Sequence, residues 1–439
     1  MLERIGATSV EDLFADIPAE VRLRVPLAIP EGQPENVVRR EIQSRLVTTD
    51  GQSLCFLGGG VWPHYVPAVV ESIMARQEFY TSYTPYQPEI SQGMLQALYE
   101  YQSLMCDLLG MEACNSSLYD WASAAAEAVR MAVRVTGRRR FVLGGNIGPE
   151  RAAVIKSYVE PLGLTLAKAP FDHATGRLSA LDVEGMLSED TAGLYFENPN
   201  YLGVIEEEAK ELVDAAHSSG ALAIVGVDPI SLSLVKEPGA YGADIAVGEG
   251  QPLGIPMNFG GPHLGIFSVK DLKLARSMPG RLIGLTSTVA DPSQKAFSMV
   301  LQTREQHIRR EAATSNVCTN QSLMALAAAS YLALLGKGGF RRLGESVISN
   351  SHYAAERISK IHGVECPLFR GPFFKEFVVG YGKKSANSIF KALSEKRVMA
   401  GYPLDKSFGL GVEAGLYCVT EMHSADDIEL LAGTLEEVL

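Results

Sequence analysis

The middle of the sequence alternates short apolar runs with longer amphipathic segments, and this alternation constrains the fold more than any other feature. The apolar runs are rich in Val and Ile and are bounded by Gly, Pro or Asn, as buried strands are. Residues 120–135 and 207–219 have helical periodicity, and Gly220 follows the second as a helix cap. We therefore predict a mostly parallel sheet with helices on both faces. The expected strands are residues 140–143, 165–169, 193–196, 221–227, 243–247 and 265–269.

The chain of 439 residues is expected to contain three parts. Residues 1–50 resemble an arm or a set of helices that packs on the rest. Residues 51–322 have the alternating pattern of a large α/β domain. Residues 323–439 begin with an apolar helix that ends near Gly336 and continue as a smaller α+β domain.

Composition excludes several classes of protein. With 39 basic and 51 acidic residues the net charge is -12, which argues against nucleic acid or an anionic membrane as principal partner. The start of the chain lacks the basic and apolar regions of a targeting peptide, and no stretch is expected to be long and apolar enough to span a bilayer. The six cysteines have no C-x-x-C spacing, so neither a metal site nor a disulfide framework is indicated. We expect a cytoplasmic protein.

Polar residues follow two of the expected strands, where ligands bind in open α/β sheets. Asp228, before Pro229, could keep a pyridine nitrogen protonated, or it could be a turn or helix-cap residue. Asn198 and Asn200 could contact a ring substituent, although a turn is the simpler interpretation. The helix start at residues 115–120 could bind a phosphate, but a cap by Ser117 or Asp120 is more common.

One lysine is missing from this arrangement. An enzyme of the aspartate-aminotransferase type that uses pyridoxal phosphate (PLP) needs an acid opposite the pyridine nitrogen and a lysine that forms a Schiff base. Between residue 228 and the strand at 265–269 the only lysine is Lys236, which lies too early, in a segment with the sequence pattern of an exposed turn. The stretch around Pro252, where the lysine is expected, contains none. The chain therefore resembles a subunit that shapes an active site whose cofactor is carried elsewhere.

Three further segments could contribute to function. A loop rich in aromatic residues and proline, residues 83–89, precedes the helix that ends at Gly110. Such rigid loops suit recognition surfaces but also simply pack. His263 follows Gly261 and Pro262; it could carry a proton or be an ordinary loop histidine. Arg309 lies in a cluster of alternating charges that could equally be a solvated helix face.

Several long phrases are similar to the glycine decarboxylase family, the pyridoxal-dependent P protein of the glycine cleavage system. The similarity runs from residue 9 to the end, and corresponds to the N-terminal half of the single-chain enzyme or to subunit 1 (alpha) of the two-subunit form. In that family the cofactor lysine belongs to the other half, in a phrase of the type N-L-H-K-T, whereas residues 249–254 here read EGQPLG. The matching phrases are FYTSYTPYQPEISQG (79–93), FLGGGVWPHYVP (56–67), NPNYLG (198–203), FGGPH (259–263), MPGRLIG (278–284) and TREQHIRREAATSNVCTNQSL (303–323).

The resemblance implies a fold and a reaction. The fold would be the type I fold of PLP-dependent transferases. Glycine would lose its carboxylate as carbon dioxide on PLP held by subunit 2 (beta), and its aminomethyl group would pass to the lipoyl arm of the H protein. The assembly would contain two alpha and two beta chains, and this chain would be inactive alone.

No residue of the chain is expected to be the catalytic acid or base. The residues expected to complete the partner's site across the interface are Tyr83, Thr84, Tyr86, Gln87, His263 and Arg309. Two alternatives stay open. The chain could be a purely structural partner of subunit 2, or a stand-alone PLP enzyme that uses an atypical lysine such as Lys236.

Overall fold

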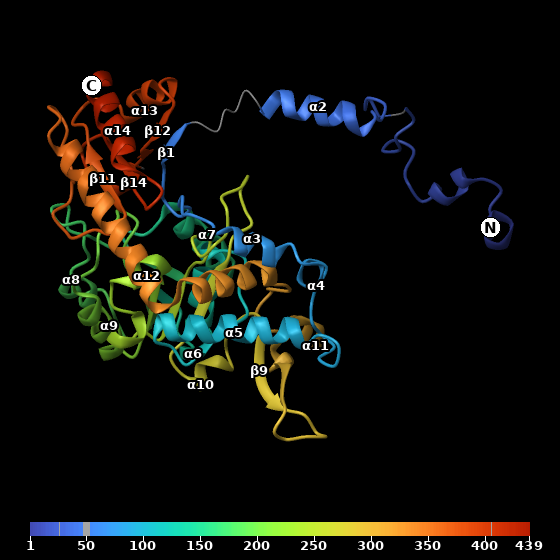
Figure 1. The fold of residues 1–439 in the computed structure, drawn as a ribbon. Helices are drawn as coiled ribbons and strands as arrows, with labels where there is room; N and C mark the ends of the chain where they lie inside the picture. The colour runs from blue at the N-terminus through green and yellow to red at the C-terminus, as the bar shows by residue number, and fades with distance from the viewer. Residues whose placement is uncertain (26, 47–52, 405) are drawn as a thin grey trace. The chain divides into compact units, whose positions relative to one another are not determined.

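The structure is a computed structural model that describes residues 1–25, 27–46, 53–404 and 406–439. It forms two compact units, Met1–Gln52 and Ser53–Leu439, and each is described by itself (Figure 1). The predicted division into three parts at residues 50 and 322 stays a prediction.

The first unit has no hydrophobic core among its described residues. It contains α1 (Leu2–Ile5), a 3-10 helix at Val10–Phe14 and α2 (Glu35–Leu46). Asp12, inside the 3-10 helix, accepts hydrogen bonds from Thr8 and from the N-cap residue Ser9, which lower the pKa of its carboxyl. None of the described residues in this unit is buried.

A seven-stranded sheet forms the centre of the second unit, in the order β2-β8-β7-β6-β5-β3-β4. Strands β7, β6, β5, β3 and β4 are parallel, and β8 runs antiparallel to both of its neighbours. All six predicted strands form, so the mostly parallel sheet is confirmed. The strands are β2 (Ala113–Cys114), β3 (Arg140–Gly144), β4 (Thr165–Ala169), β5 (Thr191–Glu197), β6 (Leu222–Val227), β7 (Ile245–Glu249) and β8 (Gly265–Val269).

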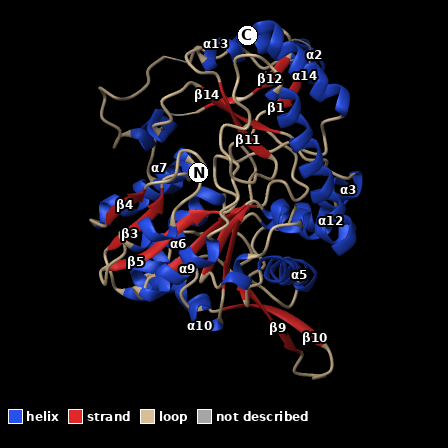
Figure 2. Ribbon diagram, turned by 90° about the vertical axis from the view of Figure 1, so that its left-hand side faces the viewer, coloured by secondary structure: helices blue, strands red, loops and turns tan. Residues whose placement is uncertain are grey.

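Helices cover both faces of this sheet, as Figure 2 shows. Successive residues of β5 point to opposite faces: Leu194 belongs to one core cluster and Tyr195 to the other. Residues of α5, α9 and the first half of α12 fill the first cluster, and residues of α6 and α7 fill the second. The described helices of this unit are α3 (Ala68–Met74), α4 (Gln77–Tyr80), α5 (Gln92–Leu109), α6 (Trp121–Thr136), α7 (Pro149–Val159), α8 (Ala180–Glu184), α9 (Ala209–Ser218), α10 (Leu272–Ala275), α11 (Gln306–Arg309), α12 (Ser322–Ser359), α13 (Ala386–Glu395) and α14 (Ala425–Val438).

The C-terminal part adds a small antiparallel sheet of β11 (Glu376–Gly380), β14 (Ala414–Cys418) and β13 (Tyr402–Pro403). Beside it, β1 (Leu54–Phe56) pairs in parallel with β12 (Val398–Ala400). A separate hairpin of β9 (Leu282–Ser287) and β10 (Lys295–Val300) projects from the body of the unit (Figures 1 and 2).

Helix α12 corrects one expectation from the sequence. Among the described residues it is the helix that is long and apolar enough, by length and composition, to cross a membrane. The expectation that no stretch approaches this size is wrong. The apolar run continues through the glycine-rich residues 336–339 to Phe340, and Lys337 is its only charged residue. Its first half packs in the protein core, and the backbone is non-helical at Gly336, where the sequence predicted the helix end.

Candidate active-site surface and a closed pocket

The aromatic loop lies on the surface between α4 and α5, and its residues differ in how they are held. Tyr83 is 74% exposed and Gln87 is also exposed. Thr84 is half-buried, and Pro85 is buried. The side chains of Tyr83 and Gln87 make no hydrogen bond to another described residue, so they are available to a neighbouring molecule.

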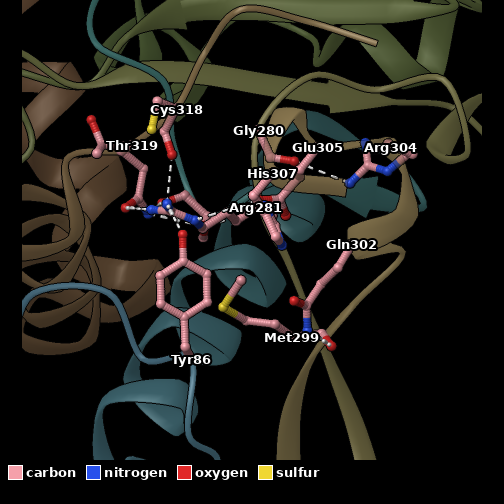
Figure 3. Close-up of polar contacts among 12 residues, drawn as sticks. Tyr86, Gly280, Arg281, Met299, Gln302, Arg304, Glu305, His307, Cys318 and Thr319 are labelled. Atoms are coloured by element: carbon pink, nitrogen blue, oxygen red, sulfur yellow. Dashed lines mark hydrogen bonds and ion pairs between the residues drawn. The ribbon is translucent and has the colours of Figure 1, made fainter. Parts of the chain in front are cut away.

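Tyr86 anchors this loop to a buried arginine, Arg281, which is 4% exposed. The Arg281 guanidinium donates to the Tyr86 hydroxyl (3.1 Å) and to the Cys318 carbonyl, and it lies 5.4 Å from the centre of the Tyr86 ring. Figure 3 shows Tyr86 and Cys318 approaching Arg281 from opposite sides. A further bond of 3.4 Å reaches the Asn320 side chain. Arg281 thus joins the loop at Tyr86 to residues 318–320, which are distant from it in sequence.

Residues 304–307 complete the surroundings of Arg281. Glu305 Oε2 lies 3.9 Å from Arg281 Nε and 3.6 Å from His307 Nδ1, and the His307 ring meets the Tyr86 ring edge-on at 5.9 Å (Figure 3). Arg304 donates to the carbonyls of Met278 and Gly280. We call the set Tyr86, Arg281, Glu305, His307 and Cys318 the Arg281 cluster.

The other two predicted site residues lie outside this cluster. Arg309 is exposed at the end of α11, and its side chain makes no hydrogen bond to a described residue. His263 lies 3.6 Å from the buried Glu249, whose carboxylate raises the pKa of the imidazole. His263 and Glu249 line an open cleft of about 340 Å³ together with Gly59, Trp121 and Tyr201.

Asp228, at the carboxyl end of β6, is fully engaged within the chain. One carboxylate oxygen caps the following 3-10 helix by accepting from the Ile230 N-H (3.2 Å), as the cap alternative predicted. The other oxygen lies 2.8 Å from the ammonium of Lys375, and both side chains are buried. Asp228 therefore already has a cationic partner.

The Lys375 ammonium also contacts His64 and Trp62. It lies 3.0 Å from His64 Nε2 and 3.8 Å from the centre of the Trp62 ring. Because an ammonium can only donate, His64 Nε2 must accept, and the imidazole proton lies on Nδ1, 2.8 Å from Glu421. Burial, and then the nearby Lys375 charge, lower the pKa of His64, so the ring is neutral.

A second buried cation, Arg151, lies near Asp228 and Lys375 and lines the same small cavity. Arg151, from α7, forms two bonds of 2.5 and 2.7 Å to the Glu197 carboxylate, and its guanidinium stacks 4.0 Å from the Trp121 ring. Asp120 caps α6 by accepting from the Ser123 N-H (2.6 Å). The predicted cap is confirmed, and it places a carboxylate at the helix end where a phosphate could otherwise bind.

Almost no space remains between these side chains. The cavity lined by Trp62, Trp121, Arg151, Asp228 and Lys375 has a volume of about 10 Å³. That is room for one water molecule at most. We call this region the closed pocket.

Comparison with known proteins identifies the family. The model of the glycine cleavage system P-protein family matches residues 1–432. The chain belongs to this family. It is 46% identical to a probable glycine dehydrogenase (decarboxylating) subunit 1 of Staphylothermus marinus over 100% of this chain and 95% of that protein. A subunit 1 of Saccharolobus solfataricus is 44% identical over the same shares of the two chains.

Solved structures agree with this assignment. A crystal structure of glycine decarboxylase (P-protein) in an inhibitor-bound form matches with a TM-score of 0.91 and 41% identity, over 100% of this chain and 97% of that one. Glutamate decarboxylase of Lactobacillus brevis has the same fold at 11% identity, with a TM-score of 0.71 over 97% of each chain. The predicted type I fold of PLP-dependent transferases is confirmed.

The closed pocket of this P-protein chain does not fit PLP. It lies beyond the carboxyl ends of the parallel strands, where ligands of such sheets bind. Yet Asp228 is paired with Lys375, Asp120 occupies the helix end, and the cavity is about 10 Å³. Pro252 is buried in the turn after β7, and Lys236 is exposed, as predicted.

Sequence reasoning missed the two cations that organise these regions, Arg281 and Lys375. A signal for Lys375 exists: Lys375 and Glu376 interrupt an otherwise apolar run at 372–380, and buried charges need partners. Which partners they find is a tertiary contact that no local pattern encodes. Arg281 carried a weaker signal, since it is the only charge within the phrase MPGRLIG.

Proposed function

We propose that this chain is subunit 1 of a glycine decarboxylase and that it acts only with a second subunit that carries PLP. The closed pocket is the observation that carries the proposal, because Asp228, the expected partner of a pyridine nitrogen, is already paired with Lys375, and the space between the surrounding side chains is about 10 Å³. The alternative of a stand-alone PLP enzyme loses support for the same reason. We infer a cytoplasmic assembly of two alpha and two beta chains.

The proposed reaction is the decarboxylation of glycine with transfer of the aminomethyl group to the lipoyl arm of the H protein. PLP in the partner supplies the electron sink when bound. The residues of this chain would orient glycine, exclude water and leave a path for the lipoyl arm.

The loop carrying Tyr83, Thr84, Tyr86 and Gln87 is the part of this chain that we assign to that task. Its exposed phenol and amide can donate hydrogen bonds to a bound substrate, and the buried Arg281 fixes the loop from behind. His263 and Arg309 remain secondary candidates, because among the described residues neither side chain has a hydrogen bond or ion pair to the Arg281 cluster. The exposed apolar side chains of Tyr80 and Ile90 flank the loop and suit an interface with the partner.

The test uses the assembled enzyme with Tyr83→Phe and Gln87→Ala, separately and together. Loss of one positioned hydrogen bond to the reacting ligand should lower kcat/KM for glycine by roughly tenfold or more per substitution. Tyr65→Phe, an exposed tyrosine outside the loop, is the matched control.

Assembly is measured in parallel by analytical ultracentrifugation. Unchanged kinetics in fully assembled variants would contradict the assignment of the loop. Weakened assembly with unchanged kinetics would instead support the alternative of a purely structural subunit.

A further inference from the structure

We propose that the closed pocket is an internal ammonium site that Lys375 fills permanently, and that this filling, independently of the missing lysine near Pro252, excludes cofactor from the chain. The proposed ammonium site lies within this chain. Its existence does not depend on whether the Tyr83 loop completes a partner's active site.

The groups around Lys375 match the hydrogen-bond donors and the positive charge of a primary ammonium. Such a group has three N-H donors and no acceptor. Asp228 Oδ2 at 2.8 Å and His64 Nε2 at 3.0 Å accept two of them, and the face of Trp62 at 3.8 Å offers its negative quadrupole to the positive charge. The charge and the donors of the buried group are thereby accounted for.

The groups around the ammonium are held in place by further contacts. Glu421 accepts from His64 Nδ1 (2.8 Å) and from the Tyr65 N-H (2.8 Å), which fixes the imidazole with Nε2 toward the lysine. The neighbouring Glu376 accepts from the Gly59 N-H at 2.6 Å. A site held in this way exists before any ligand arrives, so removal of the lysine side chain should leave a cavity that selects small alkylammonium ions.

The chain carries its own reporters for this site. It contains two tryptophans, Trp62 and Trp121, and both line the closed pocket. Tryptophan fluorescence therefore responds to occupancy of this pocket and is not diluted by other indoles of the chain.

The experiment is a chemical rescue of the full-length Lys375→Ala chain with ethylammonium chloride. We expect a Tm below that of wild type by several degrees, a saturable recovery of Tm with ethylammonium, and a saturable change in fluorescence. Sodium chloride and tetramethylammonium chloride at equal ionic strength should do neither. Wild type and Lys383→Ala, which removes an exposed lysine, should not respond. A response that does not saturate, or that tetramethylammonium reproduces, would overturn the proposal.

Two more measurements complete the test. Asp228→Asn added to Lys375→Ala should weaken ethylammonium binding by about tenfold or more, because the counter-ion is lost. If Lys375→Ala does not fold, Asp228→Asn is compared with Asp228→Asn/Lys375→Met. The double variant should have the higher Tm, since the single one leaves a buried ammonium unpaired, and a lower Tm would contradict the proposal.

Discussion

Arg281 lies at the centre of its cluster and Lys375 at the centre of the closed pocket, which Arg151 also lines, but Arg281 and Lys375 have different roles. The Lys375 ammonium contacts two acceptors, Asp228 and His64, and the ring face of Trp62. All three of these residues are buried. Arg281 supports a loop whose Tyr83 and Gln87 remain exposed. Its Nε and Glu305 Oε1 have no hydrogen-bond partner among the described residues. In this P-protein chain the pocket beyond the strand ends is closed, whereas the loop that Arg281 supports exposes Tyr83 and Gln87.

The largest effect is expected from Arg281→Ala in the assembled enzyme. The substitution frees Tyr86 and removes the positive charge 3.9 Å from Glu305, so the loop loses its fixed position. Misplacement of a positioning loop can cost roughly 10²-fold in kcat/KM. Glycine decarboxylation and Tm are measured together, with Arg342→Ala, an exposed arginine on α12, as control. Wild-type kinetics in the Arg281→Ala enzyme would show that the cluster has no role beyond packing.

Gly203→Ala tests how tightly the closed pocket is built. Gly203 has φ +85°, and a Cβ there would lie 2.0 Å from the Glu376 carbonyl oxygen. Gly363 has a similar φ of +91° with no atom within 4 Å, so Gly363→Ala isolates the cost of the backbone conformation. We expect Gly203→Ala to destabilise by roughly 2 to 6 kcal/mol, from strain and overpacking together, and Gly363→Ala by about 1 to 3. Equal losses in urea unfolding would mean that the approach to Glu376 relaxes freely.

The smallest effect is the part of the pH dependence of stability that His64 contributes. Burial, followed by the Lys375 charge, holds the pKa of His64 below its ordinary value of 6.5, whereas the unfolded chain has the ordinary value. Below about pH 6.5 the unfolded chain binds the extra proton, so stability is lost as the pH falls, by up to about 1.4 kcal/mol per pH unit.

The measurement is the free energy of unfolding at pH 5.5 and 7.5 for wild type, His64→Gln and His362→Gln. His64→Gln should remove this component of the slope. His362→Gln, at an exposed position, should keep it. Titrating groups that do not contact His64, among them Glu206, whose pKa burial raises to about 7, are common to all three proteins and cancel in the comparison. An unchanged slope in His64→Gln would show that the imidazole is not held neutral.

The sequence predicts the architecture well because its signals are local. Strands β4 and β8 have the bounds that their apolar runs indicate, Asp120 caps α6, and the helix breaks at Gly336. The missing lysine near Pro252 was visible for the same reason.

The closed pocket was not predictable in this way. Asp228 meets Lys375, and His64 meets Glu421, across segments far apart in the chain. The loop of Tyr83 and Gln87 was visible in the sequence as an aromatic and proline-rich segment within a phrase shared with the family, but nothing local shows that Arg281 holds it. Pairing of buried charges follows from the completed fold, and a pattern of residue types does not specify it.

The most direct test of the account is borohydride reduction of the assembled enzyme with PLP, followed by mass spectrometry of the lysine peptides of both subunits. We expect a stoichiometric reduced adduct on a partner lysine and none on any lysine of this chain. A stoichiometric adduct on this chain, at Lys236 or Lys375 above all, would contradict the account, because it would require the closed pocket to open and take up the cofactor itself.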